Sequence, residues 1–232
     1  MNQLKYITNL KPILEGVYIK SDGSILQSDV SKIFLINAKP KNNQFGGKEF
    51  VLSDISKNEK FIEKLEKLEE TDMSLEFSGK DRAFSYIKSQ VDAISEDEKL
   101  LALPGFTNGY KDPAKLILTN EVKEKLKELI DSGLGEHLVI YTDNGIVKSA
   151  IGGQQGKNKL VCNLSETEKN FKLTINVTFL KSLLDSIKGF SELYIQTNEA
   201  LLEIKKTIYP LKVTDKTDDY DTEIYVATRE HD

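Results

Sequence analysis

The chain has 232 residues, 39% hydrophobic and 30% charged, which is enough apolar material for one large domain or two small ones. Its net charge of −5 argues against a protein that grips DNA over its whole surface, but not against one whose basic residues are confined to one face. The sequence carries no transmembrane run, no signal-peptide pattern and one cysteine, Cys162, so we expect a cytoplasmic protein (in the host cytoplasm if it is viral) without disulfides.

An amphipathic helix followed by a β-hairpin is predicted four times along the chain. The first helix has an apolar face and ends at Gly16; the face is formed by Leu4, Ile7, Leu10 and Leu14. Residues 17–20 and 24–27 then predict a hairpin around Gly23, and residues 32–36 a further strand. The second unit begins with a strand at residues 49–52 and ends with a hairpin of residues 73–77 and 83–87. Between them, the predicted helix face consists of Phe61, Ile62, Leu65 and Leu68.

The third and fourth units follow the same order. Residues 115–118 predict a strand, and Thr119 or Asn120 can cap the next helix, whose apolar face is Val122, Leu126, Leu129 and Ile130. The third hairpin, residues 137–141 and 146–149, has the strong turn signal Asn144-Gly145. The fourth unit has a strand at residues 171–175, a hairpin at residues 192–196 and 201–204, and a last strand at residues 222–227. Its helix face is Val177, Leu180, Leu183, Leu184 and Ile187, before Gly189.

The spacing of the hairpins indicates an internal repeat. They begin near Val17, Ser74, Leu138 and Leu193, at intervals of 57, 64 and 55 residues. Residues 95–112 are rich in charge and contain a proline and two glycines, which predicts a linker. We therefore expect an α+β protein of two similar domains, residues 1–94 and 113–232, each with two helices on one face of an antiparallel sheet.

Residues that could perform catalysis or hold a metal are few. His137, His231 and Cys162 lack the spacing of a zinc set. Residues 152–158 fail as a phosphate loop, because Ile151 and Asn158 stand where that motif needs Gly and Ser or Thr, and a flexible hairpin loop is expected instead. The acidic positions 215, 218, 219 and 221 lack the pattern of an EF-hand and predict a solvated turn. We expect no catalytic residue, no metal, no cofactor and no enzymatic activity.

Lysines recur on the polar sides of all four predicted helices. In chain order they are Lys5, Lys11, Lys57, Lys60, Lys64, Lys67, Lys123, Lys127, Lys181 and Lys188. On any one helix such a stripe is usually a solvated face, stabilised by Lys–Glu pairs one turn apart. If the four helices share one side of the molecule, however, the lysines converge there. Their flexible ammonium groups then suit loose, sequence-independent contacts with phosphates.

This layout resembles the sliding clamps, the proliferating-cell-nuclear-antigen family, and most closely the short clamps of tailed phages. The resemblance covers nearly the whole chain, with its most specific matches at residues 116–151, 171–204 and 223–228. It implies the DNA-clamp fold and a closed ring, a homotrimer, whose helices face encircled double-stranded DNA. It also implies a processivity factor for a replicative DNA polymerase, loaded onto DNA by an ATP-dependent clamp loader.

The resemblance further implies a pocket for a partner's peptide, between the domains and under the linker. Its candidates are Ala200, Leu201, Tyr225, Val226 and Ala227 by match, and Leu101, Leu103 and Phe106 by location. For Tyr225 and Val226, ordinary strand packing is the competing interpretation, because alternation places half of a strand in a core. The family's typical pocket proline is absent and the linker is shorter and less apolar, which leaves the docking motif of the partner open.

Two other functions stay open at this point. One is a structural or assembly protein of a phage, built from the same repeats and not binding DNA. The other, an enzyme with a site between the domains, is weaker, because no nucleophile, metal or acid–base set is visible. Self-association and an effect on polymerase processivity separate the first alternative from a clamp.

Overall fold

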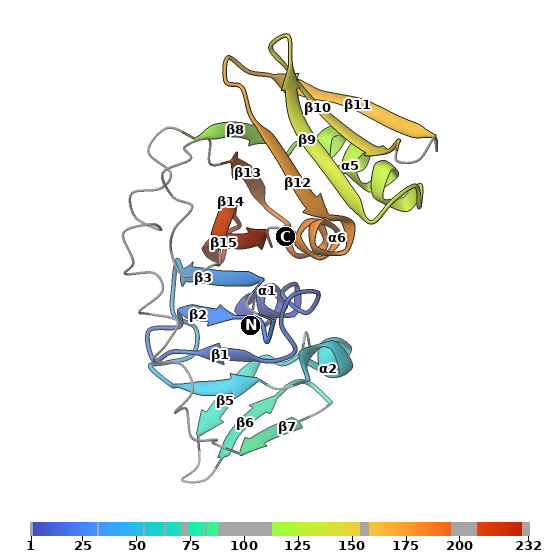
Figure 1. The fold of residues 1–232 in the computed structure, drawn as a ribbon. Helices are drawn as coiled ribbons and strands as arrows, with labels where there is room; N and C mark the ends of the chain where they lie inside the picture. The colour runs from blue at the N-terminus through green and yellow to red at the C-terminus, as the bar shows by residue number, and fades with distance from the viewer. Residues whose placement is uncertain are drawn as a thin grey trace.

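A computed structural model describes residues 2–31, 33–52, 54–62, 64–70, 74–81, 83–87, 113–153, 158–195 and 208–228. Among these residues, no helix is both long and apolar enough to cross a membrane. The elements of the N-terminal half are α1 (Asn2–Thr8), β1 (Val17–Ile19), β2 (Ile25–Ser28), β3 (Phe34–Pro40), β4 (Phe50–Leu52), α2 (Ile55–Ile62), β5 (Lys67–Glu70), β6 (Ser74–Ser78) and β7 (Ala83–Ile87) (Figure 1).

The C-terminal half repeats the same kinds of element. They are β8 (Ala114–Ile117), α5 (Asn120–Asp131), β9 (His137–Asp143), β10 (Ile146–Gly152), β11 (Lys159–Glu166), β12 (Lys172–Asn176), α6 (Val177–Ser186), β13 (Phe190–Ile195), β14 (Ile208–Lys216) and β15 (Tyr220–Thr228). The strands pair antiparallel throughout the described chain, so the predicted α+β class with antiparallel sheets is confirmed.

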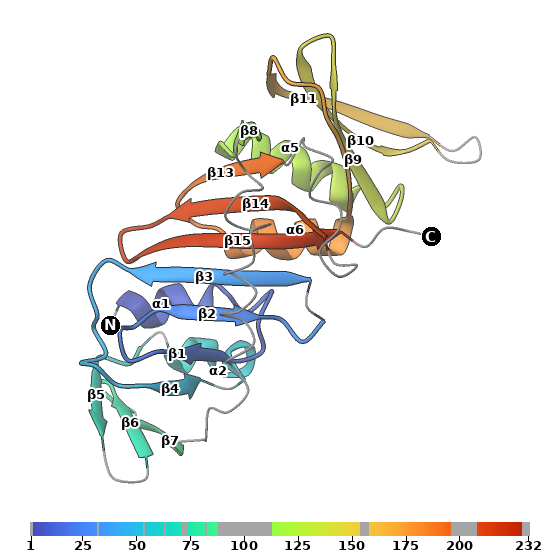
Figure 2. The ribbon, with the colours of Figure 1, turned by 60° about the vertical axis from the view of Figure 1, so that its left-hand side comes forward.

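One sheet runs through both halves of the molecule. Its strand order is β2-β3-β15-β14-β13-β8, and the two halves meet where β3 pairs with β15. Ile36 lies opposite Ile224 in this pair, and the Ala227 N–H donates to the Ile33 carbonyl at 2.7 Å. A four-stranded sheet, β11-β10-β9-β12, and a three-stranded sheet, β5-β6-β7, lie at opposite ends of the molecule (Figures 1 and 2).

The four helices of the described residues lie on one side of the sheets, which we call the helix face; the opposite side is the strand face (Figures 1 and 2). A hydrophobic core fills the space between helices and strands. It includes Leu4 and Ile7 from α1, Leu126 from α5, Leu183 from α6 and Ile224 from β15, each at most 1% exposed. The single apolar stripe predicted for each helix therefore faces the sheets, which leaves the polar sides of the helices pointing away from them.

Local sequence signals account for several boundaries. Thr119 caps α5 by accepting from the Val122 N–H at 3.2 Å, and Asn176 caps α6 by accepting from the Thr178 N–H at 2.8 Å. The β9–β10 hairpin turns at Asn144 and Gly145, whose φ angles of 49° and 77° are both positive. A two-residue hairpin turn needs positive φ angles at both positions for its twist to match that of the flanking strands, and Asn-Gly adopts these angles at low cost.

The second predicted helix is shorter than expected. It ends at Ile62, and bonds from the Lys64 N–H to the Phe61 carbonyl and from the Leu65 N–H to the Ile62 carbonyl tighten the chain into a turn. Leu68, predicted on the helix, lies in β5 and still packs against the core. The prediction was wrong here because a short β-strand and a helix can both present apolar residues at the observed spacing.

Other predictions were wrong for equally specific reasons. The turn at Gly23 is present, but the predicted hairpin between β1 and β2 is not, because β1 pairs with β4 and β2 pairs with β3. Side-chain hydrogen bonds of Gln27 connect β2 to β1 in place of backbone pairing. Strands β5, β11 and β14 were not predicted.

Asp215, predicted in a solvated turn, is 2% exposed and accepts from the Ser191 hydroxyl at 2.7 Å and the Gly189 N–H at 2.9 Å. The strand at residues 201–204 lies outside the described residues.

Candidate nucleic-acid interface

The predicted DNA-facing lysines of the N-terminal half belong to α1, α2 and the turns beside them. Lys5 is exposed on α1, and Lys57 and Lys60 are exposed on α2. Lys64 lies in the turn after α2 and Lys67 begins β5, so the stripe predicted on one helix continues onto a turn and a strand. All five of these side chains are solvent-exposed. Lys5, Lys57 and Lys60 lie on the helices, whereas Lys67 precedes the core residue Leu68 in β5 and therefore points away from the helix face.

Acidic side chains neutralise part of this charge. Lys11, just after α1, forms an ion pair with Glu59 of α2, and so ties the two helices together. Lys57 pairs with Asp54, Nζ to Oδ1, at 2.7 Å. The hydrogen bond to Asp54 raises the pKa of Lys57. Because both pairs lie near the surface, they are weak and can exchange with other anions.

In the C-terminal half, three of the predicted lysines gather at one place. Lys123 of α5 is half-buried, with its Nζ 3.4 Å from the Ser191 hydroxyl oxygen. Burial lowers the pKa of Lys123; the carboxylate of Asp215 opposes this, and repulsion from Lys188 and Lys127 adds to it. Lys123 therefore lies close enough to Lys127 and Lys188 to be repelled by both, and an anion bound beside it would relieve that repulsion.

The two C-terminal helices exchange ion pairs. Lys127 on α5 pairs with Asp185 on α6 at 2.9 Å, and Lys181 on α6 pairs with Asp131 on α5 at 3.0 Å. The four side chains are 41% to 64% exposed. The helix face therefore carries lysines interleaved with carboxylates rather than an uninterrupted basic surface, and its attraction for a polyanion is moderate.

The described residues of the predicted peptide pocket lie in β15, where the two halves of the chain meet. Tyr225, Val226 and Ala227 are all at most 5% exposed. Val226 belongs to the core on the helix side, whereas Tyr225 and Ala227 alternate onto the strand face. The other candidates, Leu101, Leu103, Phe106, Ala200 and Leu201, lie outside the described residues.

Apolar and polar neighbours surround Tyr225 on the strand face. Leu35, fully buried, lies directly opposite it in β3. Glu223 accepts from the Tyr225 hydroxyl at 2.9 Å and pairs with Lys212 at 3.3 Å. Burial, reinforced by Glu223, raises the pKa of Tyr225, so the phenol stays protonated and can donate. This arrangement fixes the orientation of the Tyr225 ring.

A cavity of about 550 Å³ lies beside this group on the strand face, lined in part by Leu26, Asn37 and Lys39. Leu26 and Leu35 lie in predicted strands but were not predicted as residues of the pocket. The run Ile33-Phe34-Leu35-Ile36 held a signal, because an unbroken apolar run indicates a strand that is covered on both faces. Among the described residues, no group of three or more His, Cys, Asp or Glu side chains could hold a metal ion.

No model of a known protein family matches the chain, and no curated protein matches its sequence. Solved structures do match. A PCNA2–PCNA3 complex from Sulfolobus tokodaii aligns over 99% of this chain and 97% of the other, with a TM-score of 0.68 at 14% identity. PCNA of A. fulgidus, with the C-terminal region of FEN-1 bound, aligns over 99% and 96%, with a TM-score of 0.69 at 13% identity.

Proliferating Cellular Nuclear Antigen from Entamoeba histolytica also aligns, over 96% of this chain and 93% of the other, with a TM-score of 0.60 at 12% identity. Three such alignments over nearly the full length, with similar coverage of both chains, show that this protein has the sliding-clamp fold. The resemblance inferred from the repeats is confirmed at the level of the fold.

Proposed function

We propose that this chain is the subunit of a sliding clamp, a non-enzymatic ring that encircles duplex DNA and tethers a replicative DNA polymerase to it. The observation that carries the proposal is the position of α1, α2, α5 and α6, with their exposed lysines, on one side of the sheets (Figure 1). A ring built with that side inward presents lysines to DNA from every subunit. Two domains of two units each, residues 1–94 and 113–232, form each subunit.

The mixed charge of the helix face suits sliding. Lys127 and Lys181 alternate between a carboxylate and a phosphate at little cost, because their ion pairs are exposed and worth less than about 1 kcal/mol each. Such contacts are screened by salt and carry no sequence information. A ring held by topology needs no strong contact, and strong bidentate contacts would arrest it.

The free edges of the sheets support ring closure. Within the described residues, β7 pairs only with β6 and β11 only with β10, and these two edges lie at opposite ends of the molecule (Figure 2). Leu160 and Val161 on β11 are 44% and 46% exposed. Pairing β11 of one copy with β7 of the next covers both edges, and a head-to-tail contact of this kind closes a ring; we propose three copies.

Partners then bind the strand face where the two halves meet. The docking site is the cavity lined in part by Leu26, Asn37 and Lys39, which has room for a side chain, beside the buried side chains of Tyr225, Ala227 and Leu35. A. fulgidus PCNA was solved with a segment of FEN-1 bound. For this chain we propose that segments of the polymerase and of an ATP-dependent clamp loader bind here, the loader opening the ring.

The test is primer extension on a singly primed circular template, with the cognate polymerase and loader. The proposal predicts long products only when the chain, loader and ATP are all present, because tethering raises the local concentration of the polymerase. Cutting the template allows the ring to slide off and shortens the products again. Product lengths that do not depend on the chain would reject the proposal.

A further inference from the structure

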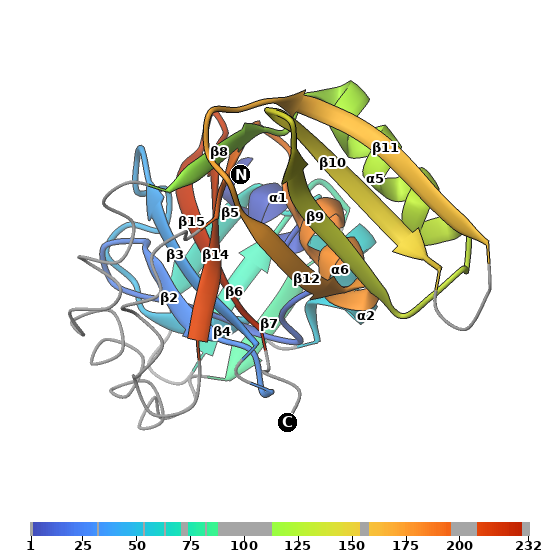
Figure 3. The ribbon, with the colours of Figure 1, turned by 45° about the horizontal axis from the view of Figure 1, so that its top comes forward.

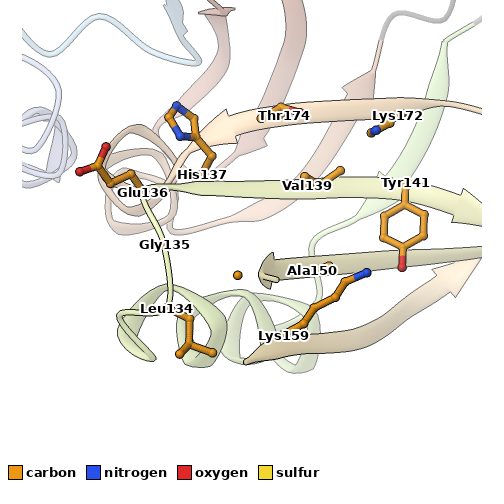
Figure 4. Close-up of a pocket in the computed structure, with 11 residues that line it drawn as sticks. Leu134, Gly135, Glu136, His137, Val139, Tyr141, Ala150, Lys159, Lys172 and Thr174 are labelled. Carbon is orange, nitrogen blue, oxygen red and sulfur yellow. The ribbon is translucent and has the colours of Figure 1, made fainter. Parts of the chain in front are cut away.

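A groove of about 780 Å³ crosses the strand face of the β11-β10-β9-β12 sheet (Figure 4). Helix α5 packs on the other face of this sheet (Figure 3). The groove is therefore separate from the lysines of the helix face. It is also separate from Tyr225, which belongs to the six-stranded sheet. Neither the proposed DNA-facing side nor the proposed docking site beside Tyr225 uses it, and only its margin at β11 borders the edge proposed to close the ring.

The strand register explains the floor of the groove. Ala150, Val139 and Thr174, which line the groove, lie opposite one another in three neighbouring strands, and Val161 of β11 continues this row past the lining. These side chains are small, and Val161 is 46% exposed. Strands are spaced about 4.8 Å apart, so the row is roughly 14 Å long, which an extended segment covers with four or five residues.

Taller polar side chains border the floor on both sides. Lys159 and His137 stand on one side, and Tyr141 and Lys172 on the other. The Lys159 side chain extends toward Tyr141 (Figure 4). Both lysines are exposed, and no ion pair joins either of them to a described part of the chain. The lining includes one carboxylate, Glu136.

This chemistry selects the kind of ligand. The groove has an apolar floor between two free ammonium groups, on a chain whose net charge is −5. A ligand that complements it has small apolar side chains for the floor and carboxylates for the amines. We propose that the groove docks an extended acidic segment of a partner protein, with carboxylates against Lys159 and Lys172 and apolar side chains on Val139 and Ala150.

The test is fluorescence anisotropy of the full chain with a labelled probe peptide that alternates Asp and Glu with Val and Leu. We expect saturable binding, which the double substitution Lys159→Glu and Lys172→Glu weakens by about tenfold or more, because charge reversal at both contacts replaces attraction with repulsion. The matched control is Lys80→Glu with Lys216→Glu, two exposed lysines outside the groove. It should bind the probe like the unmodified chain.

Three results would overturn the proposal. They are unsaturable binding of the probe, equal binding by the Lys159→Glu, Lys172→Glu variant, and full competition by single-stranded DNA, which would make the groove a general polyanion surface. Circular dichroism of each variant checks the fold; because both lysines are exposed, we expect no change. The assay needs no duplex, polymerase or loader, so its outcome is independent of the clamp function.

Discussion

The rings of Tyr6 and Tyr220 stack, with centroids 4.3 Å apart and planes 20° from parallel. Tyr6 lies on α1 and Tyr220 begins β15, so this contact joins the start of the chain to its last strand. The Tyr6 hydroxyl also bonds to Thr222, and the Tyr220 hydroxyl donates to the Gly23 carbonyl at 3.1 Å. The two tyrosines therefore hold α1 against β15, the strand whose pairing with β3 joins the two halves of the molecule.

Truncating this contact should destabilise the whole fold. Tyr6→Ala removes a ring that is 4% exposed, and we expect the free energy of unfolding to fall by about 3–5 kcal/mol. Tyr220→Phe keeps the stacking and loses one hydrogen bond, so it should cost about 1 kcal/mol. Urea denaturation followed by circular dichroism measures both. Similar losses in the two variants would show that the stacked rings contribute little.

Alkaline pH should weaken the fold through the buried tyrosines. Burial raises the pKa of Tyr6 and Tyr220 above the ordinary value of about 10. Above that value the unfolded chain loses these protons while the folded chain keeps them, so stability falls as pH rises, by up to about 1.4 kcal/mol per pH unit for each tyrosine.

Urea denaturation at several pH values between about 9 and about 11 measures that slope. Tyr6→Phe should make it shallower, because a phenylalanine cannot ionise in either state. Tyr141→Phe, at a half-buried position on the strand face, serves as the control. An unchanged slope in the Tyr6→Phe variant would remove Tyr6 as a cause of the pH dependence.

The overall arrangement of the fold could be predicted from sequence because its signals are local. Thr119, Asn144 and Gly145 act on their immediate neighbours, and the helix stripes depend only on period. The pairing of β1 with β4 and of β3 with β15 could not be predicted in this way, since contacts between distant segments decide it. The burial of Asp215 likewise depends on donors from another loop and strand.

Reversing exposed charge beside α2 should impair clamp function without unfolding the chain. We expect the combined variant Lys57→Glu, Lys60→Glu and Lys64→Glu to load poorly onto DNA, because these exposed lysines of α2 and the turn after it would face phosphates. Its melting temperature should stay close to that of the unmodified chain. Retention on nicked circular DNA after loading measures the effect.

A matched control uses Lys80→Glu, Lys172→Glu and Lys216→Glu, three exposed lysines away from the helices. It changes the net charge equally and should leave retention unaffected. Equal impairment in both variants would attribute the effect to total charge. A large drop in melting temperature for the first variant alone would show that its lysines are structural.

Removing the carboxylates that pair with α5 and α6 lysines should have the opposite effect. In the variant Asp131→Asn with Asp185→Asn, Lys127 and Lys181 lose their partners and become available to phosphates. We expect tighter binding to a short duplex, with a steeper decline as salt rises. Anisotropy of a labelled duplex across a salt series measures both. An unchanged salt dependence would mean that these lysines do not reach the DNA.

Only part of each candidate site could be predicted from the sequence. Helical periodicity identified the lysines on α1, α2, α5 and α6, but not the carboxylates of Asp131 and Asp185 that pair with them across helices. The groove beside Tyr141 left no sequence signal, because its floor is assembled by register from four strands. Conversely, the layout of four helix–hairpin units, a linker and a closing strand carried the resemblance to the sliding clamps.

The most direct test of the central claim is the mass of the chain in solution, by size-exclusion chromatography with light scattering at micromolar concentrations. Closure through the β7 and β11 edges predicts a discrete species of three times the 26.2 kDa chain mass. A stable monomer across that concentration range would contradict a ring that encloses DNA.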